Sequence, residues 1–481
     1  MVGYNFWRGR LFTALSLQLF QRKLEDGNQD GKSVVVVKEA QGTPFDGELV
    51  YKSATPEARD NQERVFVEAT LSSSERDIET HISSLLKWGS SQPFSLFLFS
   101  LSSDETCFTL AERFSFDKVR VRITFFGITD FSGLVTKYGI ETYSILKKFD
   151  TKNEMALSKE EGGTIRYSIP EIAQYGALGE ILRQNARITQ EQFNQHQAYL
   201  IRNVKKSLLA NQTALLLGNG ISLDYGADTW PKLVQDLLSY LQPMLVDDVS
   251  TSAVLVGGNS YSETQLVKFA FRNKIYNGLD HYYKAIHNCI YQKFLNLFPT
   301  ETTLHSVGIL LDRYSPETIT FNYDEFLESD FRNYYPSKTI CSLFDGALPV
   351  PTNAVVVNHV HGFMPVDYRQ VTPSEQASIV LSEEEYFDFY VKKKKIWGYR
   401  MISDAVQNKQ CVLIGLSLSD MYLRMIFKRA TYWNGHVMIL CRQGLDAKDR
   451  LVVRDYFLEM NVDIIWADTF KDIPNLILSF R

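Results

Sequence analysis

Four short stretches of the chain place small, polar or titratable residues directly after an apolar run. They are Gly218-Asn219-Gly220-Ile221-Ser222, Phe321-Asn322-Tyr323-Asp324, His361-Gly362 and Gly415-Leu416-Ser417-Leu418-Ser419-Asp420. Glycine-rich loops let backbone N–H groups approach an anion such as a phosphate. An amide, a carboxylate and an imidazole can orient a polar ligand and transfer a proton near neutral pH. Together the four stretches predict a ligand site with acid–base chemistry, if the fold brings them to one place.

Taken alone, each stretch also has an ordinary structural explanation. Turns between a strand and a helix often hold two glycines, and Asn322, Asp324 or Asp420 can simply cap a helix. An isolated histidine such as His361 is more often a satisfied core residue than a functional one. The dinucleotide fingerprint G-x-G-x-x-G is also missing, because Leu223 stands where its third glycine would be. The prediction therefore depends on the four stretches meeting.

The segments that must position these residues have the pattern of a parallel, doubly wound α/β sheet. Short apolar strands alternate with helices from Thr213 onward; they are TALLLG, ETITFN, AVVVNHVHG, KQCVLIG, HVMILC and VDIIWA. Strands that are apolar throughout are typical of a sheet covered on both faces. Such sheets bind ligands at the carboxyl ends of their strands, where the four stretches lie. Residues 262–298, between the first two strands, are expected to form a mostly helical insertion.

The N-terminal part shows a separate α/β pattern. Helices are expected at 5–22 and 77–88, and strands at 33–37, 47–51, 64–71, 95–100 and 119–127. A polar, glycine-containing stretch at 150–166 is typical of a linker, and 169–209 has the composition of an exposed helical bridge. We therefore expect a smaller α/β domain at 1–150, a linker and helical bridge at 151–209, and a Rossmann-like domain at 210–481.

Composition excludes several classes of protein. The 481 residues are 45% apolar and 22% charged, which is typical of a soluble globular chain. A net charge of −5 argues against a protein that mainly coats nucleic acid, although a local basic patch stays open. The five cysteines form no C-x-x-C pair, which argues against a zinc ribbon and fits reduced thiols. No run reaches the roughly 18 apolar residues that span a bilayer. We expect a cytoplasmic protein without membrane contact.

The four stretches, in this order and spacing, resemble the sirtuin family, and most closely its bacterial sirtuin-like branch in antiphage defence. The first loop is similar to G-x-G-x-S followed by G-x-x-x-W, with Gly226 and Trp230 completing it. Thr320-Phe321-Asn322-Tyr323-Asp324, with Glu328, is similar to T-x-N-Y-D…E. His359-Val360-His361-Gly362 is similar to H-x-H-G, and the segment from Ile414 to Asp420 to I-G-x-S-L-x-D. The resemblance covers about residues 205–481 and includes IVLSEEEYFDFY at 379–390.

The resemblance implies that this region binds NAD as a substrate and needs no metal. It implies catalytic roles for Asn322 and Asp324, near the nicotinamide ribose, and for His361 as general base. The implied NAD-binding residues are Gly218, Asn219, Gly220, Ser222, Gly226, Trp230, Thr320, Gly415, Ser417 and Asp420. Within H-x-H-G, strand alternation places His359 and His361 on the same side of the sheet, and only the match at His361-Gly362 favours His361.

Three functions are compatible with an NAD site. Protein-deacylating sirtuins carry a four-cysteine zinc module that this chain lacks, and a helical insertion replaces it. We therefore favour water as the nucleophile, with NAD converted to nicotinamide and ADP-ribose. A non-catalytic sensor of NAD or ADP-ribose would not need both Asn322 and His361. The resemblance further implies a triggered effector of antiphage defence that acts by NAD depletion, assembles as a homo-oligomer and responds to a partner protein or a phage-derived trigger.

The N-terminal domain suggests a different activity. Glu39, Asp46 and Glu68 lie in a pattern that weakly resembles the core of restriction-endonuclease-like folds, in which two carboxylates bind Mg²⁺ and a lysine assists the attacking water. Here the E-x-K triplet reads Glu68-Ala69-Thr70, so the lysine is missing. Acidic residues at strand ends are also common on ordinary surfaces. We expect a degenerate module for assembly or trigger sensing, with nuclease activity or nucleic-acid sensing as the alternative.

Overall fold

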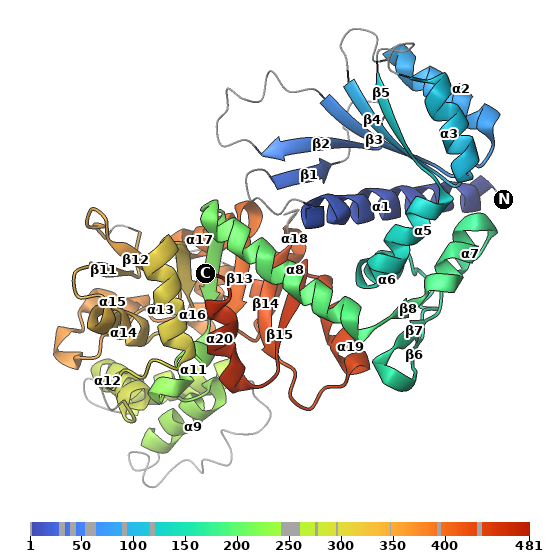
Figure 1. Ribbon diagram of the computed structural model, residues 1–481. Coiled ribbons are helices and arrows are strands. Elements are labelled where there is room, and N and C mark those ends of the chain that lie inside the picture. The colour runs from blue at the N-terminus through green and yellow to red at the C-terminus, as the bar shows by residue number, and fades with distance from the viewer. Residues whose placement is uncertain are drawn as a thin grey trace. The chain divides into compact units, whose positions relative to one another are not determined.

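Two compact units make up the chain, Met1–Tyr199 and Leu200–Arg481. Figure 1 shows the computed structural model, with the N-terminal unit in blue to green and the C-terminal unit in green to red. It describes residues 2–27, 34–38, 45–52, 64–88, 94–115, 121–241, 260–274, 278–294, 297–346, 348–391, 396–430 and 435–481. Among the helices within these ranges, none combines the length and the apolar character of a membrane-spanning segment.

A five-stranded mixed sheet forms the centre of the N-terminal unit. Its order follows the chain: β1 (Val34–Lys38), β2 (Gly47–Lys52), β3 (Arg64–Thr70), β4 (Phe94–Ser100) and β5 (Arg122–Phe126). The first three strands are antiparallel, whereas β3, β4 and β5 run parallel. Helices α1 (Val2–Gly27), α2 (Glu75–Trp88) and α3 (Asp104–Arg113) accompany the sheet. The predicted order of a helix, three strands, a second helix and two strands is thus confirmed, with α3 added between β4 and β5.

The segment after the first sheet differs from the expected linker and single long helix. Helices α5 (Ile128–Lys137) and α6 (Gly139–Lys148) lead into a small antiparallel sheet of β6 (Leu157–Lys159), β7 (Ile165–Tyr167) and β8 (Arg187–Ile188). Helix α7 (Gly176–Asn185) ends before β8, and α8 (Gln190–Leu209) begins after it. The break has a local cause: the Thr189 hydroxyl accepts from the Gln192 N–H, and the Gln192 side chain accepts from the Thr189 N–H. This reciprocal cap starts a new helix.

Seven parallel strands form the sheet of the C-terminal unit, in the order β11-β12-β10-β9-β13-β14-β15. Their bounds are β9 (Thr213–Leu217), β10 (Glu317–Thr320), β11 (Ile340–Leu343), β12 (Val355–His359), β13 (Gln410–Ile414), β14 (His436–Cys441) and β15 (Val462–Ala467). All residues of β9 and β13 are buried, as expected for central strands covered on both faces. The Rossmann-like prediction is confirmed; the short edge strand β11 was not predicted.

The strand order places a topological switch at β9. From β9 the chain first builds β10, β11 and β12 on one side, and it then returns to add β13, β14 and β15 on the other. A crevice opens at the carboxyl ends of the strands at such a point, because successive connections leave in opposite directions. The loops after β9, β10 and β13 therefore meet at one position.

Helices pack around this sheet and complete the unit. Between β9 and β10 the described part of the predicted helical insertion contains α9 (Trp230–Leu241), α11 (Ser260–Lys274) and α12 (Gly278–Tyr291), followed by α13 (Thr303–Tyr314). Buried side chains of α9, α11 and α12 share one apolar core cluster. The remaining helices are α14 (Phe326–Tyr334), α15 (Pro373–Ser378), α16 (Glu383–Tyr390), α17 (Ile396–Asn408), α18 (Met421–Arg429), α19 (Ala447–Leu458) and α20 (Ile473–Leu478).

Candidate functional site

A cavity of about 500 Å³ lies at the carboxyl edge of the sheet, where the switch point places it. The loops after β9, β10, β12 and β13 line it, together with residues of α9, α12 and α16. Ten of the predicted site residues border the cavity: Gly218, Asn219, Gly220, Trp230, Asn322, Asp324, His361, Gly415, Ser417 and Asp420. Ser222, Gly226 and Thr320 do not line the cavity, but each forms a hydrogen bond with a residue that does. The volume is in the range of pockets for small molecules and cofactors.

The glycines of the first and fourth loops allow two backbones to cross in contact. The Gly218 N–H donates to the Ile414 carbonyl and the Gly220 N–H to the Gly415 carbonyl, each at 2.9 Å. A Cβ on Gly218 would lie 2.5 Å from the Gly415 carbonyl oxygen, and one on Gly220 would lie 2.6 Å from the Gly415 Cα. Gly415 itself has φ +65, which favours glycine. These glycines are thus needed for loop-on-loop packing.

This crossing corrects the expected role of the two glycine N–H groups. Both are already bonded to the β13 loop, so they do not point at a ligand. Among the described residues, the N–H groups of Asn219, Leu416 and Ser417 have no hydrogen-bond acceptor, and all three residues line the cavity. Leu418 holds the turn in a left-handed conformation, with φ +51 and a side chain 2% exposed. The amides of Asn219 and of the 416–417 turn are therefore suited to bind an anion in the cavity.

Asn322 is held by hydrogen bonds that fix the direction of its amide. Its Nδ2 donates to the Gly218 carbonyl at 3.3 Å and to the Ser222 hydroxyl at 3.1 Å. The opposite amide orientation would place Oδ1 against a carbonyl oxygen, so the contact to Gly218 determines the assignment. Both amide hydrogens are used within the protein. What Asn322 offers to the cavity is therefore its Oδ1, an acceptor with a partial negative charge.

Asp324 completes a buried chain of hydrogen bonds behind Asn322. The Ser222 hydroxyl donates to Asp324 Oδ1 at 3.1 Å, and the Phe326 N–H donates to the same oxygen at 3.2 Å. Burial raises the pKa of Asp324 to about 6, despite these bonds. Ser222 is fully buried, so its hydroxyl contacts Asn322 and Asp324 and is not exposed to the cavity. The chain runs from Asn322 through Ser222 to Asp324, so the first loop and the β10 loop are locked together.

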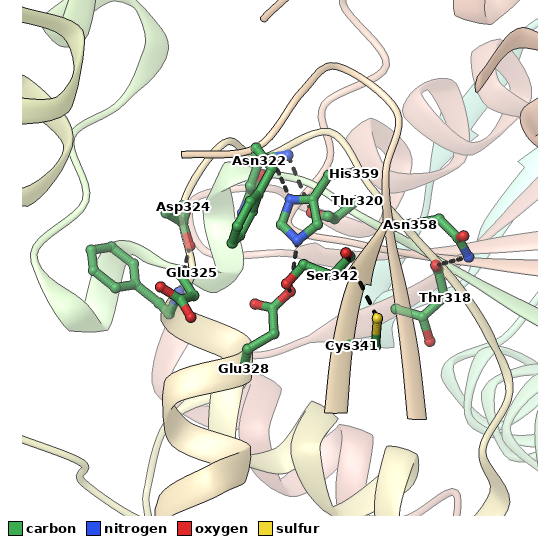
Figure 2. Close-up of polar contacts among 12 residues, drawn as sticks. Thr318, Thr320, Asn322, Asp324, Glu325, Glu328, Cys341, Ser342, Asn358 and His359 are labelled. Carbon is green, nitrogen blue, oxygen red and sulfur yellow. Dashed lines mark hydrogen bonds and ion pairs between the residues drawn. The ribbon is translucent and has the colours of Figure 1, made fainter. Parts of the chain in front are cut away.

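His359 forms a buried ion pair that holds the loop of Asn322 from the other side. Its Nε2 lies 2.6 Å from Glu328 Oε1, and its Nδ1 lies 3.0 Å from the Asn322 carbonyl oxygen (Figure 2). The neighbouring carboxylate of Glu328 raises the pKa of His359 against the opposing effect of burial, and an imidazolium can donate to both oxygens. The Ser342 hydroxyl donates to the same Glu328 oxygen at 2.8 Å. His359 is thus a structural partner of the main chain at Asn322.

His361, in contrast, lies at the cavity. Strand β12 ends at His359, so the alternation that would place the two histidines on the same side no longer applies. The Val380 N–H fixes the main chain by donating to the His361 carbonyl at 2.8 Å. The imidazole makes edge-to-face contacts with Phe321 and with Tyr386, Phe389 and Tyr390 of α16. Sequence reasoning singled out the segment 379–390 but did not identify these aromatic side chains as site residues.

The other predicted site residues shape the loops of the cavity. Asn219 Nδ2 donates to the Asp228 carbonyl at 2.5 Å and so fastens the segment that leads to Trp230, the first residue of α9. Gly226, with φ +90, turns the chain within this segment. The Thr320 hydroxyl accepts from the Asn322 N–H at 3.1 Å. Asp420 caps α18, since its Oδ1 accepts from the N–H groups of Tyr422 and Leu423.

In the N-terminal unit the two described acidic residues of the predicted nuclease pattern lie together. The Asp46 N–H donates to Glu68 Oε2 at 3.0 Å, the Ala69 N–H donates to Asp46 Oδ2 at 2.9 Å, and His81 lies 2.7 Å from Glu68 Oε1. Burial and the neighbouring Glu68 raise the pKa of Asp46 to about 6. Glu39 lies outside the described residues. Within the described ranges of both units, no group of three or more His, Cys, Asp or Glu side chains has an arrangement that could hold a metal ion.

Comparison with known proteins identifies part of the C-terminal unit. No curated protein matches the chain. The family described as SIR2-like domain matches residues 316–465, which extend from the start of β10 into β15 and include Asn322, His361 and Asp420. The first loop precedes this match, but β9 pairs directly with both β10 and β13 and so belongs to the same sheet. The C-terminal unit therefore contains, at residues 316–465, a SIR2-like domain, the domain of a family of NAD-dependent enzymes.

Proposed function

We propose that the C-terminal unit hydrolyses NAD to nicotinamide and ADP-ribose. The observation that carries the proposal is that Asn322 and His361, which follow different strands, line one cavity at the switch point of the sheet. Both residues belong to the SIR2-like match at 316–465. NAD is the substrate class expected there, and the cavity of about 500 Å³ is of a size to hold much of one.

The residues match the electronic demands of this reaction. The bond between C1 of the ribose and the pyridinium nitrogen breaks, its electron pair neutralises the nitrogen, and positive charge develops on the sugar. The Asn322 Oδ1 supplies a fixed partial negative charge for that state. Water then forms the new C–O bond, and His361 accepts the proton that the water loses. The N–H groups of Asn219 and of Leu416 and Ser417 are suited to the pyrophosphate.

The helical insertion supports water as the nucleophile. Cys289 and Ile290 of α12 and residues of α9 form part of the cavity wall, where they add apolar surface. Burial raises the pKa of Cys289 to about 12, so its thiol is not a nucleophile near neutral pH. The polar groups of Asn322, Asp324 and His361 thus border a chamber whose wall is partly apolar.

The experiment that tests the proposal is an incubation of the intact protein with NAD, with and without an acetyl-lysine peptide. Release of nicotinamide and ADP-ribose in equal amounts, without any need for the peptide, supports hydrolysis. Nicotinamide release that depends on the peptide and yields acetylated ADP-ribose contradicts it in favour of deacylation.

The resemblance to defence proteins supports a further proposal: the protein acts as an oligomeric, triggered effector of low basal activity. Cells that carry the gene should then lose NAD on phage infection, and cells with His361→Ala should not.

A further inference from the structure

We propose that Tyr390 is a positioning residue whose hydroxyl links His361 to Asp420 and thereby determines which imidazole nitrogen carries the proton. The proposal rests on the proposed function for its catalytic consequence, but its structural content is independent of it. Tyr390 is the last residue of α16, 29 residues after His361 in the chain and 30 before Asp420. Neither the four predicted stretches nor the match to the SIR2-like domain singles it out.

Contacts on both sides of the Tyr390 hydroxyl support this link. The hydroxyl oxygen lies 3.3 Å from His361 Nε2. The same hydroxyl is a hydrogen-bond partner of the Asp420 side chain; burial raises the pKa of that carboxyl, and this bond is among the contacts that partly oppose the rise. Tyr390 is 6% exposed and its ring stacks on that of Tyr422 at 5.1 Å between centroids, so packing of the ring restricts the position of the hydroxyl.

The direction of the protons follows from the fixed donors around Asp420. Its Oδ1 accepts from two backbone N–H groups, those of Tyr422 and Leu423, which can only donate. Asp420 is therefore an acceptor, and the single proton of the Tyr390 hydroxyl is best placed on this carboxylate. The hydroxyl oxygen then accepts from His361 Nε2–H. His361 is thereby held in the Nε2–H tautomer, which leaves Nδ1 as its basic nitrogen.

Few titratable groups surround the imidazole on the described elements. Tyr386 and Tyr390 face it from α16, and Phe321 and Phe389, its other ring contacts, do not titrate. Asp420 acts through Tyr390, and Arg424 of α18 acts on Asp420. Asp324 lines the same cavity. A hydrogen bond accepted from Nε2–H is stronger when the ring is charged, so loss of the hydroxyl should weaken His361 as a base.

The test compares Tyr390→Phe with Tyr422→Phe in the full chain. Tyr390→Phe removes only the bridging hydroxyl and keeps the ring stack; Tyr422→Phe removes a hydroxyl from the other ring of that stack, which among the described residues has no hydrogen-bond partner. Histidine is labelled with ¹⁵N, and the signal of His361 is assigned by its loss in His361→Gln. The pH titration and the tautomer of that signal are then measured in the wild type and in both variants.

We expect the Nε2–H tautomer in the wild type and a titration midpoint of His361 that falls by about 0.5 to 1 pH unit in Tyr390→Phe, the effect of losing one hydrogen bond. The acid limb of kcat/KM for NAD should move by the same amount, with KM unchanged, and Tyr422→Phe should leave both measurements unaltered. An Nδ1–H tautomer, or an unchanged His361 midpoint in Tyr390→Phe, overturns the proposal. If the wild type does not turn over NAD but the midpoint still moves, the proposed function fails while the Tyr390 link stands.

Discussion

At the scale of single residues, the site depends on hydrogen bonds that leave Asn322 with one free polar atom. Its two amide hydrogens are bound by Gly218 and Ser222, so only Oδ1 is offered to the cavity. Ser222 serves as both acceptor and donor in this arrangement, because its hydroxyl accepts from Asn322 and donates a hydrogen bond to Asp324. The Gly218 carbonyl determines the direction of the Asn322 amide, and the buried Ser222 hydroxyl helps to hold it in place.

Removing the Ser222 hydroxyl should therefore impair both stability and turnover. Ser222→Ala leaves an Asn322 amide hydrogen without a partner and removes one of the two hydrogen bonds to Asp324 Oδ1, which costs about 1 to 3 kcal/mol in the free energy of unfolding. We also expect kcat to fall while NAD binding is largely kept. Ser306→Ala is the matched control, since Ser306 is 1% exposed and its hydroxyl has no partner among the described residues. Urea unfolding and steady-state kinetics measure both effects; an equal, small loss in the two variants would speak against the network.

Sequence reasoning reached most of these residues but not their arrangement. Asn322, Asp324 and His361 were identifiable because they follow apolar strands, and strand ends meet in a doubly wound sheet. The separate roles of His359 and His361 were not, because alternation holds only inside a strand and β12 ends at His359. The role of Tyr390 could not be predicted either, because its contact with His361 comes from the tertiary packing of α16 and has no local sequence signal.

At the scale of secondary-structure elements, the crossing of two glycine loops determines the shape of the cavity. Gly415 has φ +65, and a Cβ on it would lie 2.6 Å from the Ile221 backbone nitrogen. Gly444 has a similar φ of +84, but a Cβ there would meet nothing within 4 Å. The two positions share the same backbone strain and differ only in steric contact.

Substitution of these two glycines should separate strain from steric conflict. Gly444→Ala should cost about 1 kcal/mol, the typical penalty of a left-handed conformation for a residue with a Cβ. Gly415→Ala should cost clearly more and should also weaken NAD binding, because the β9 and β13 loops must move apart. Thermal unfolding and calorimetric titration with NAD provide the comparison. Equal destabilisation and unchanged NAD affinity in both variants would refute the loop-crossing explanation.

Strands and helices were predictable where the local sequence marks them clearly, by an apolar run or by a capping residue. Six of the seven strands of the C-terminal sheet were expected from their apolar runs, whereas the edge strand β11 (Ile340–Leu343) has two partly exposed residues at its centre. The second helix of the 169–209 segment was merged with the first, although Thr189 and Gln192 form the reciprocal cap that marks its start. Short edge strands depend on pairing with a neighbour more than on their own sequence.

At the scale of the whole molecule, one described carboxyl group in each unit has a pKa raised to about 6: the half-buried Asp46 in the N-terminal unit and the buried Asp324 in the C-terminal one. Burial also raises the pKa values of Asp330 and Asp420 in the C-terminal unit. Because the native pKa values of Asp46 and Asp324 exceed the ordinary value of 3.8, the folded state binds protons more tightly than the unfolded state. The contribution of these two carboxyl groups to the free energy of unfolding is therefore full below about pH 4, and it is lost as the pH rises through about 6. Each group accounts for up to roughly 3 kcal/mol of this loss.

Replacing each of Asp46 and Asp324 by an amide should reduce the pH dependence of its own unit only. Asp46→Asn should flatten the change in unfolding midpoint between pH 5 and pH 7 for residues 1–199, and Asp324→Asn should do so for residues 200–481. Urea unfolding followed by mass-spectrometric mapping of protected peptides gives a separate midpoint for each unit. If either variant alters the pH dependence of both units equally, the assignment of the Asp46 and Asp324 effects to separate units is wrong.

The central claim is that one cavity, with Asn322 and His361 in its wall, cleaves NAD with water. The most direct measurement mixes labelled NAD with an excess of the full-length protein, so that even a slow resting enzyme completes a turnover, and it measures NAD binding in parallel. We predict equal amounts of nicotinamide and ADP-ribose from the wild type, and intact NAD from Asn322→Ala and His361→Ala, both of which should still bind it. Intact NAD with the wild type, or equal cleavage by all three proteins, would contradict the account.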